Sequence, residues 1–307
     1  MKDTLLITGG SGLLGSNLAT VAINSFSVHV TYCNHTIVSK TVQAHKLDLT
    51  KSEGLLLLVK KIKPAYIVHT AALTNVDFCE NNKEEAWLTN VEATKNVVKA
   101  TKAAGSKLIY ISTDSVFDGK KGMYFEEDPP NPLNYYALTK LEGEKIVGES
   151  KVPFVTIRTN IYGWNMQKKM SLAEWMLNSF IEKRKITLFS DVFFTPIFVN
   201  NLSSAILEIA KKDILGLFHV AGSERCSKLQ FGLILAKVFD LDTTGLIEPV
   251  LIASQNFAAK RPLDTSLTSE KIKSKIDSNL LKVQEGLESF KQLMQNGYVE
   301  NLKACQV

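Results

Sequence analysis

The segment at residues 5–15, LLITGGSGLLG, constrains the fold of this chain more than any other. An apolar run of β character leads into a glycine-rich turn, and an apolar helical pattern follows at once. Glycine allows turn angles that other residues adopt only at a cost, and it lets the backbone approach a pyrophosphate closely. Gly10, Gly12 and Gly15 fit the three-glycine dinucleotide fingerprint, and Gly9, Gly12 and Gly15 fit an evenly spaced variant. The segment therefore predicts a nucleotide site at a helix amino end, with a plain structural turn as the alternative.

Size and composition fit either one large α/β unit or a nucleotide domain with a smaller partner. The chain has 307 residues, of which 45% are hydrophobic, and its net charge of +5 is scattered without a long basic tract. We therefore expect no binding to nucleic acid. No apolar run is long enough for a membrane span, and no cluster has metal-ligand spacing, so we expect neither a membrane segment nor a metal site. We interpret the widely spaced cysteines as reduced thiols of a cytoplasmic protein: Cys33, Cys79, Cys226 and Cys305.

The alternation of apolar runs with helical patterns predicts a doubly wound parallel sheet of the Rossmann type, with helices on both faces. Strands are expected near 28–32, before 49, and at 65–69, 107–113 and 154–158, and helices at 13–23, 52–63, 83–104 and 135–149. Later helices are expected near 171–184, 201–211, 227–239 and 279–295, and short strands at 186–189, 197–199, 217–220 and 247–252. We predict a dinucleotide-binding domain at residues 1–162 and a smaller α/β substrate lobe at residues 163–307, with segments crossing between them.

Tyr136 and Lys140 lie four residues apart at the start of a predicted helix. That spacing places both side chains on one helix face. A lysine cation favours the phenolate and so moves the tyrosine pKa from about 10 toward the range useful for proton transfer. The same spacing also occurs by chance on solvated helices. Thr113 strengthens the catalytic interpretation, because it follows a strand whose carboxyl end is where an open parallel sheet binds ligands.

Taken together, these features resemble the extended short-chain dehydrogenase/reductases. The resemblance covers most of the chain and is carried by residues 8–15, Asp48-Leu49, Ala71-Ala72, Asn90, Ser112-Thr113-Asp114 and residues 136–140. Within that family the chain is most similar to the dTDP-4-dehydrorhamnose reductase branch. The branch-like segments are STDSVFDG at 112–119, PLNYY at 132–136, KLEGE at 140–144 and Arg261-Pro262.

The resemblance implies a set of cofactor-binding residues. The pyrophosphate would be held by the glycine segment, through Gly9, Ser11, Gly12, Leu13, Leu14 and Gly15. Asp48, next to Leu49, would accept from the adenine amino group, although a turn aspartate after a strand is the alternative. Ala71 and Ala72 would let the cofactor ribose approach the sheet edge. Asn90 would support the lysine and a relay water, with a helix-surface asparagine as the alternative.

The resemblance also implies catalytic and substrate residues. Tyr136 would be the general acid in reduction, Lys140 would bind the nicotinamide ribose and lower the tyrosine pKa, and Thr113 would hydrogen-bond the substrate carbonyl. The substrate candidates are Asp114, Asn160, Tyr162 and Arg261, in addition to Thr113.

These roles imply an NAD(P)H-dependent reductase of a nucleotide-linked 4-keto-deoxysugar. Ser115 stands where related dehydratases carry the second residue of an acidic pair, which argues against dehydration. Two alternatives stay open. The branch also resembles the regulatory subunit of methionine adenosyltransferase, a partner protein that keeps the cofactor site, and an epimerase would use the same fold. The sequence leaves the oligomeric state open, with a homodimer among the options.

The end of the second expected strand indicates which cofactor is used. An acid about twenty residues after the glycines marks NAD, because it receives the adenine-ribose hydroxyls. Here the strand ends in TYCNH at residues 31–35, without an acid. NADPH is therefore favoured, with NADH use also expected. His35 and Lys40 are the candidates to contact a ribose phosphate.

Overall fold

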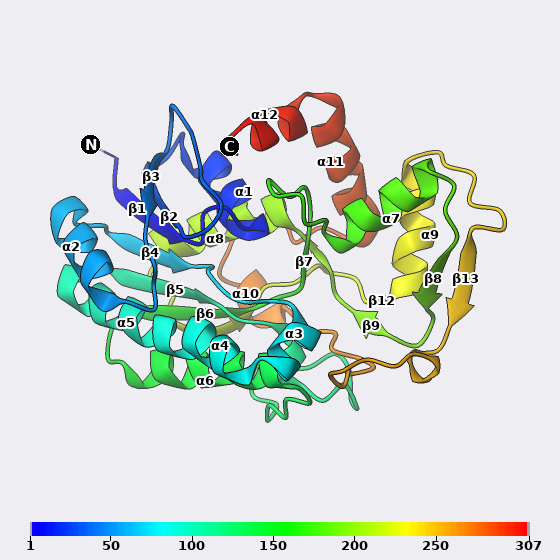
Figure 1. Cartoon of the computed structure of the whole chain (residues 1–307), viewed down its shortest axis with the longest axis horizontal. Helices are drawn as coiled ribbons and strands as arrows, with labels where there is room; N and C mark the ends of the chain where they lie inside the picture. The colour runs from blue at the N-terminus through cyan, green and yellow to red at the C-terminus, as the bar shows by residue number, and fades with distance from the viewer. Residues whose placement is uncertain (1, 306–307) are drawn as a thin grey trace.

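A seven-stranded parallel sheet forms the centre of the protein, and a smaller lobe extends from one end of it (Figure 1). The structure is a computed structural model that describes residues 2–305. The strand order is β11-β6-β5-β4-β1-β2-β3, and every neighbouring pair is parallel. The strands are β1 Thr4–Thr8, β2 Ser27–Tyr32, β3 Gln43–Lys46, β4 Tyr66–His69, β5 Lys107–Ile111, β6 Phe154–Arg158 and β11 Gly216–His219.

Strand β1 shows why the early sequence is continuously apolar. Leu5, Leu6 and Ile7 are each 0% exposed, as expected for a strand whose two faces are both covered. Successive side chains point to opposite faces, so Leu5 and Ile7 join one core cluster and Leu6 joins the other. Ile7 also lies opposite Val30 of β2 and Val68 of β4. The glycine turn thus begins from a strand that is buried on both faces.

Helices pack on both faces of the sheet, which confirms the predicted α/β class (Figure 1). One face carries α1 Leu13–Ala22 and α8 Val199–Lys211. The other carries α2 Ser52–Ile62, α5 Ala93–Ala104 and α6 Tyr135–Glu149. The single helix predicted over 83–104 is divided into α4 Lys83–Trp87, the π-helical turn η1 Leu88–Glu92 and α5. The short α3 Val76–Asn81 precedes it and contacts α6.

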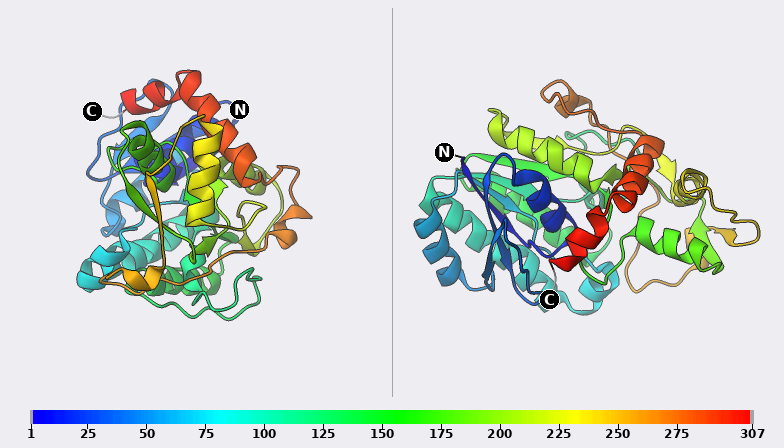
Figure 2. Two further views of the ribbon diagram at one scale, coloured as in Figure 1. Left: turned by 90° about the vertical axis from the view of Figure 1, so that its right-hand side faces the viewer. Right: turned by 90° about the horizontal axis from the view of Figure 1, so that it is seen from above.

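The smaller lobe is built from helices and two-stranded sheets of the later chain (Figure 2). Its elements are β7 Ile161–Tyr162, α7 Leu172–Ile181, β8 Ile186–Phe189, β9 Phe193–Phe194, β10 Ile197–Phe198, β12 Cys226–Ser227, α9 Lys228–Val238, β13 Ile247–Val250 and α11 Val283–Gln295. The short helix α10 Glu270–Lys273 instead contacts β11 of the large sheet. Residues 199–219 return to the large sheet, where they supply α8 and the edge strand β11. A domain boundary at residue 162 therefore assigns α8 and β11 to the smaller lobe, although they belong to the large sheet and its helical layer. The exact domain boundary stays a prediction.

The last helix, α12 Tyr298–Ala304, brings the end of the described chain back to the nucleotide layer. The Tyr298 hydroxyl donates to Asn17 Oδ1 of α1 at 2.8 Å and accepts from Asn200 Nδ2 of α8 at 3.0 Å. The amide of Val38 donates to the carbonyl of Cys305 at 2.8 Å. These contacts fasten the loop that follows β2 to the C-terminal helix. Helices α3, α10 and α12 were not predicted from the sequence, because such short helices show little periodicity.

A buried ion pair joins α6 to β6 directly behind the carboxyl edge of the sheet. Arg158 donates from Nε to Glu144 Oε1 at 2.9 Å and from Nη2 to Oε2 at 2.7 Å. The side chains are only 3% and 9% exposed, and the Ser112 hydroxyl also donates to Glu144. The Arg158 guanidinium lies 5.0 Å from the ring centre of Phe117. The pair fixes α6 on the sheet, because neither charge could stay buried without the other.

We expect Arg158→Met to lower the free energy of unfolding by about 3–5 kcal/mol, because it leaves the Glu144 carboxylate buried without its cation. Urea unfolding followed by circular dichroism measures this change. The double variant Glu144→Leu/Arg158→Met removes both charges and should recover most of the loss. A single variant that costs less than about 1 kcal/mol, within the range of exposed pairs, would contradict this account of the pair.

Candidate active site

A cavity of about 460 Å³ opens at the carboxyl ends of β1, β4 and β5. This is the edge at which doubly wound sheets bind ligands. Ten of the residues singled out from the sequence lie along its wall: Gly12, Leu13, Leu14, Gly15, Ala72, Thr113, Asp114, Tyr136, Lys140 and Asn160. The fold thus brings together the glycine turn, the Tyr136–Lys140 pair and Thr113, which are far apart in the chain.

The glycines of the turn have different physical tasks. Gly9 adopts φ +71°, and a Cβ there would lie 2.7 Å from the backbone of Ala71. A Cβ on Gly15 would overlap the carbonyl of Gly9, so this glycine allows α1 to start against the turn. Gly12 is the N-cap of α1 with extended backbone, φ −77° and ψ 169°, and a Cβ there would meet only Gly9 O, at 3.3 Å. The missing side chain at Gly12 therefore leaves open space in the cavity. A side chain would strain the turn at Gly9 and at Gly15 instead.

These observations fit a dinucleotide phosphate. Gly12 lines the cavity, and the amides at the start of α1 have no partner within their own helix. A group with negative charge is stabilised at that end of the helix dipole. We infer that the open space at Gly12 is where the backbone of the turn would approach a pyrophosphate.

Tyr136 is set in place by the start of α6. Asn134 is the N-cap, and its side chain accepts from the amide of Ala137 at 3.0 Å. The next turn of the helix places Tyr136 and Lys140 on the cavity wall together. Burial raises the pKa of Tyr136, and the nearby Asp114 charge adds to this, while a hydrogen bond with Thr113 acts in the opposite direction. Burial, and not the expected lowering by the lysine, therefore sets the direction of the Tyr136 pKa shift, and the phenol stays protonated near neutral pH.

Lys140 is only 4% exposed, although it reaches the cavity. Burial lowers the pKa of Lys140 to about 7, and the Glu144 carboxylate one turn later acts against this shift. The same ammonium lies 4.2 Å from the ring centre of Tyr110 in β5. Burial thus disfavours the charged form of this lysine, and the Glu144 carboxylate and the Tyr110 ring are the groups that favour it.

Thr113 and Asp114 form the polar wall opposite the helix. Asp114 Oδ2 accepts from Asn160 Nδ2 at 2.7 Å and from the Thr265 hydroxyl at 2.6 Å. Its Oδ1 accepts from the hydroxyls of Thr113, at 3.1 Å, and Ser115, at 3.2 Å. Asp114 is only 1% exposed, so its role is to hold these side chains in place and not to contact a ligand directly. This geometry leaves Thr113 and Asn160 as the stronger substrate candidates.

Asn90 acts through contacts that the sequence does not show. It lies in the π-helical turn η1, and its Nδ2 donates to the Thr139 hydroxyl at 3.0 Å and to Leu73 O at 3.1 Å. Its Oδ1 accepts from the Leu73 amide at 2.7 Å. Asn90 therefore links the loop after β4 to the residue before Lys140. π-helical turns are frequent at functional sites, which agrees with this position.

Other predicted cofactor residues do not line the cavity. Ser11 accepts from Gln167 through its carbonyl, at 2.9 Å, and Ala71 packs against Gly9. Asp48 is exposed, and its Oδ1 accepts from both the hydroxyl and the amide of Thr50. These hydrogen bonds, that of the hydroxyl first, lower the pKa of Asp48. Asp48 is thus a turn aspartate here, and its role at an adenine, like that of the neighbouring Leu49, stays a prediction.

Two predicted substrate residues point elsewhere. Tyr162 is 2% exposed, and its ring packs between Phe198, Phe231 and Phe290 in the core of the smaller lobe. Arg261 pairs with Asp77 Oδ2 at 2.7 Å and does not line the cavity. We therefore leave Tyr162 out of the proposed substrate site, because apolar packing already uses its ring.

The loop at residues 165–171 lines the cavity from the side of the smaller lobe, and most of its residues were not predicted to belong to the site. Gln167 Nε2 donates to Ser11 O, and Lys169 Nζ donates to the Thr74 hydroxyl at 3.2 Å. Asn165 holds the loop by donating to Lys169 O at 2.7 Å. In the sequence only the neighbouring lysines 168 and 169 suggest that this loop could meet a phosphate, and such a pair is more often plain solvated surface.

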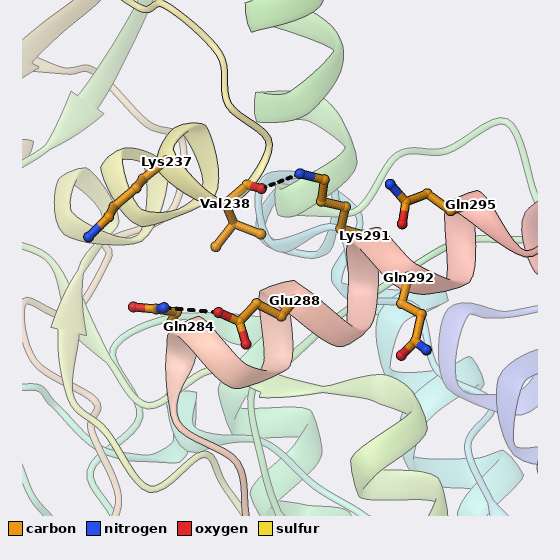
Figure 3. Close-up of a pocket in the computed structure, with 7 residues that line it drawn as sticks. All are labelled: Lys237, Val238, Gln284, Glu288, Lys291, Gln292 and Gln295. Atoms are coloured by element: carbon orange, nitrogen blue, oxygen red, sulfur yellow. Dashed lines mark hydrogen bonds between the residues drawn. The ribbon is translucent and has the colours of Figure 1, made fainter.

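A second hollow of about 300 Å³ lies between α9 and α11 (Figure 3). Its polar side chains bond to their own surroundings: Lys291 Nζ donates to Val238 O at 2.7 Å, and Gln284 donates to Glu288 at 2.9 Å. None of the predicted site residues lines it. Within residues 2–305 no three potential ligands come together for a metal, and no helix has the length and apolar character to cross a membrane.

Comparison with known proteins decides the family. The family model described as "RmlD substrate binding domain" matches residues 1–296. The chain belongs to this family. It is the dTDP-4-dehydrorhamnose reductase branch of the extended short-chain dehydrogenase/reductases, as the sequence resemblance indicated.

Relatives of two kinds are similar to this chain. A dTDP-4-dehydrorhamnose reductase from Bacillus anthracis, solved in complex with NADP, matches 95% of this chain and 99% of its own at a TM-score of 0.85 and 26% identity. A hypothetical dTDP-4-dehydrorhamnose reductase from Sulfolobus tokodaii matches 93% and 99% at a TM-score of 0.82 and 34% identity. Methionine adenosyltransferase 2 subunit beta from Rattus norvegicus is 31% identical over 277 residues, which is 88% of this chain and 81% of that protein.

The open space at Gly12 gives a direct test of the site. We expect Gly12→Val to abolish nicotinamide cofactor binding while the protein stays folded, because the branched side chain would fill the cavity, and its one tight contact with the turn, at 3.3 Å from Cβ to Gly9 O, needs only a small shift. Calorimetric titration measures the affinity, and circular dichroism checks the fold. Gly148→Val is the matched control, since its neighbourhood is open, its backbone is not in the left-handed region and it does not line the cavity. Unchanged affinity in the Gly12 variant would mean that the turn is structural only.

Proposed function

We propose that this protein is an NADPH-dependent reductase of a nucleotide-linked 4-keto-deoxysugar, with dTDP-4-dehydrorhamnose as the first substrate to test. One observation carries the proposal: Thr113, Tyr136 and Lys140 line the same cavity as the glycine turn. A hydroxyl, a protonated phenol and a buried ammonium are the groups that proton exchange with a carbonyl oxygen requires. The relatives named as dTDP-4-dehydrorhamnose reductases support the choice of sugar.

The residues divide the work as follows. The glycine turn and the first turn of α1 would hold the pyrophosphate, and Lys140 would bind the ribose next to the nicotinamide. When bound, the reduced cofactor supplies a hydride. The Thr113 hydroxyl donates to Asp114 here and would turn to donate a hydrogen bond to the substrate carbonyl, while Tyr136 donates its proton to that oxygen as negative charge develops there. Because burial raises the pKa of Tyr136, the phenol is in the form needed for this donation at neutral pH.

A second candidate function has a specific observation in its favour. Methionine adenosyltransferase 2 subunit beta proteins match this chain at up to 31% identity. A non-catalytic subunit would bind the cofactor at the same turn but would not oxidise it. The epimerase neighbours, at 17–18% identity, support only the fold.

Incubation of the purified protein with NADPH and a panel of nucleotide-linked keto-sugars separates these functions. The reductase proposal expects sugar-dependent consumption of NADPH, with the fastest turnover among the 4-keto-6-deoxy substrates. Cofactor that binds but is not consumed with any sugar would overturn it and favour the regulatory subunit. We further propose a cytoplasmic location, which the four unpaired cysteines support. A homodimer remains a prediction, tested by sedimentation.

The acid role of Tyr136 predicts the effect of removing its hydroxyl. We expect Tyr136→Phe to lower single-turnover hydride transfer by about a hundredfold or more, since general acid catalysis typically contributes that much. Cofactor affinity should stay at the wild-type level. Tyr135→Phe is the matched control, because the Tyr135 ring contacts Lys83, 5.4 Å away, and does not line the cavity. Near wild-type hydride transfer in the Tyr136 variant would exclude the phenol from the chemistry.

The loop after β2 predicts which cofactor is preferred. His35 and Lys40 are exposed there and no acid follows the strand, so we expect NADPH to be used at least as well as NADH. Even one cationic contact to a ribose phosphate should register in affinity. Turnover efficiency with each cofactor, in one buffer at one salt concentration, measures the preference. Lys40→Ala should reduce it and the exposed Lys46→Ala should not. A strong preference for NADH would show that an acid from elsewhere reaches the ribose.

A further inference from the structure

The ammonium of Lys140 rests on the face of an aromatic ring. Its Nζ lies 4.2 Å from the ring centre of Tyr110, which is 0% exposed in the middle of β5. The Tyr110 hydroxyl donates to the backbone carbonyl of Lys140 at 3.3 Å. No carboxylate within residues 2–305 forms an ion pair with Lys140. The ring is therefore in direct contact with the ammonium and can favour its charge.

Tyr110 is held firmly in this position. Gly143 lies over it on α6, where a Cβ would overlap the phenol oxygen, so the helix has a notch that admits the ring. On the other side the ring of His69 lies 5.8 Å away, centre to centre. His69 is itself fixed at both nitrogens, by the hydroxyls of Thr8 at 2.7 Å and Thr94 at 3.1 Å. Two strands and two helices thus hold the ring beneath the lysine.

The surrounding charges leave the ammonium short of stabilisation. Burial lowers the pKa of Lys140 to about 7, and Glu144 opposes this from one turn away, although Arg158 already pairs with that carboxylate. Burial lowers the pKa of His69 to about 3, with a further contribution from the Lys140 charge, so His69 is neutral. The remaining titratable neighbour is Tyr136, whose pKa is raised by burial. The quadrupole of an aromatic face attracts a cation most strongly where water is excluded.

We propose that Tyr110 is a positioning residue that keeps Lys140 charged and presses it against β5, beside Tyr136. The effect on catalysis rests on the proposed function, whereas the effect on the charge of Lys140 does not. A cation–π contact between desolvated groups corresponds to a shift of about one pH unit in the lysine titration.

The test measures the charge of Lys140 directly. An acylating reagent modifies only the neutral amine, so the rate of acetylation of Lys140, followed by peptide mass spectrometry across pH, reports its titration in the protein without cofactor. We expect the midpoint to fall by about one pH unit in Tyr110→Leu. It should stay at the wild-type value in Tyr110→Phe, which keeps the ring, and in Tyr66→Leu, a matched loss of a tyrosine from the neighbouring strand. A midpoint that is unchanged or higher in Tyr110→Leu overturns the proposal.

A second series preserves the packing in case Tyr110→Leu does not fold. Phenylalanine and increasingly fluorinated phenylalanines at position 110 keep the ring while weakening its negative face. The midpoint should fall step by step along this series, and a constant midpoint would overturn the proposal. In the reductase assay the alkaline limb of kcat/KM should move in the same direction. If the labelling midpoint moves while even the wild-type protein consumes no NADPH, the role of Tyr110 stands and the reductase proposal fails.

Discussion

Strands β1, β4 and β5 run parallel, so the residues that follow them meet at one edge of the sheet. The glycine turn follows β1, Ala71-Ala72 follow β4 and Thr113 follows β5. Helix α6 then crosses this edge with Tyr136 and Lys140 on its inner face, and the buried Glu144–Arg158 pair fixes its angle. With a different strand order these residues would lie far apart and could not form one site.

Much of this arrangement could be predicted from the sequence, because it depends on patterns within short segments. The period of the apolar residues gave the strands and most helices, and the glycine spacing and the Tyr136–Lys140 spacing identified the two sides of the cavity. The π-helical turn at Asn90 could not be predicted, since its cause is the bonding of Asn90 to Leu73 and Thr139, which are distant in sequence. The role of residues 165–171 depends in the same way on how the smaller lobe packs over the turn.

Tyr162 shows that packing can oppose the role which a family resemblance implies for a residue. It is one of the substrate candidates that the resemblance implies, but its ring fills the apolar space between β10, α9 and α11. For Tyr136 the direction of the pKa shift was predicted wrongly. The spacing to Lys140 predicted a lower pKa, whereas burial raises it. For a reductase that donates a proton, the protonated phenol is the useful form.

The central claim is that a hydride passes from NADPH to a keto-sugar in this cavity. Its most direct test uses NADPH deuterated at the nicotinamide carbon that donates the hydride, with dTDP-4-dehydrorhamnose as acceptor and mass spectrometry of the sugar product. Our account predicts that one deuterium appears at the former carbonyl carbon with the wild-type protein, and none with Tyr136→Phe on the same time scale. Bound NADPH that keeps its deuterium while the sugar remains a ketone would contradict it.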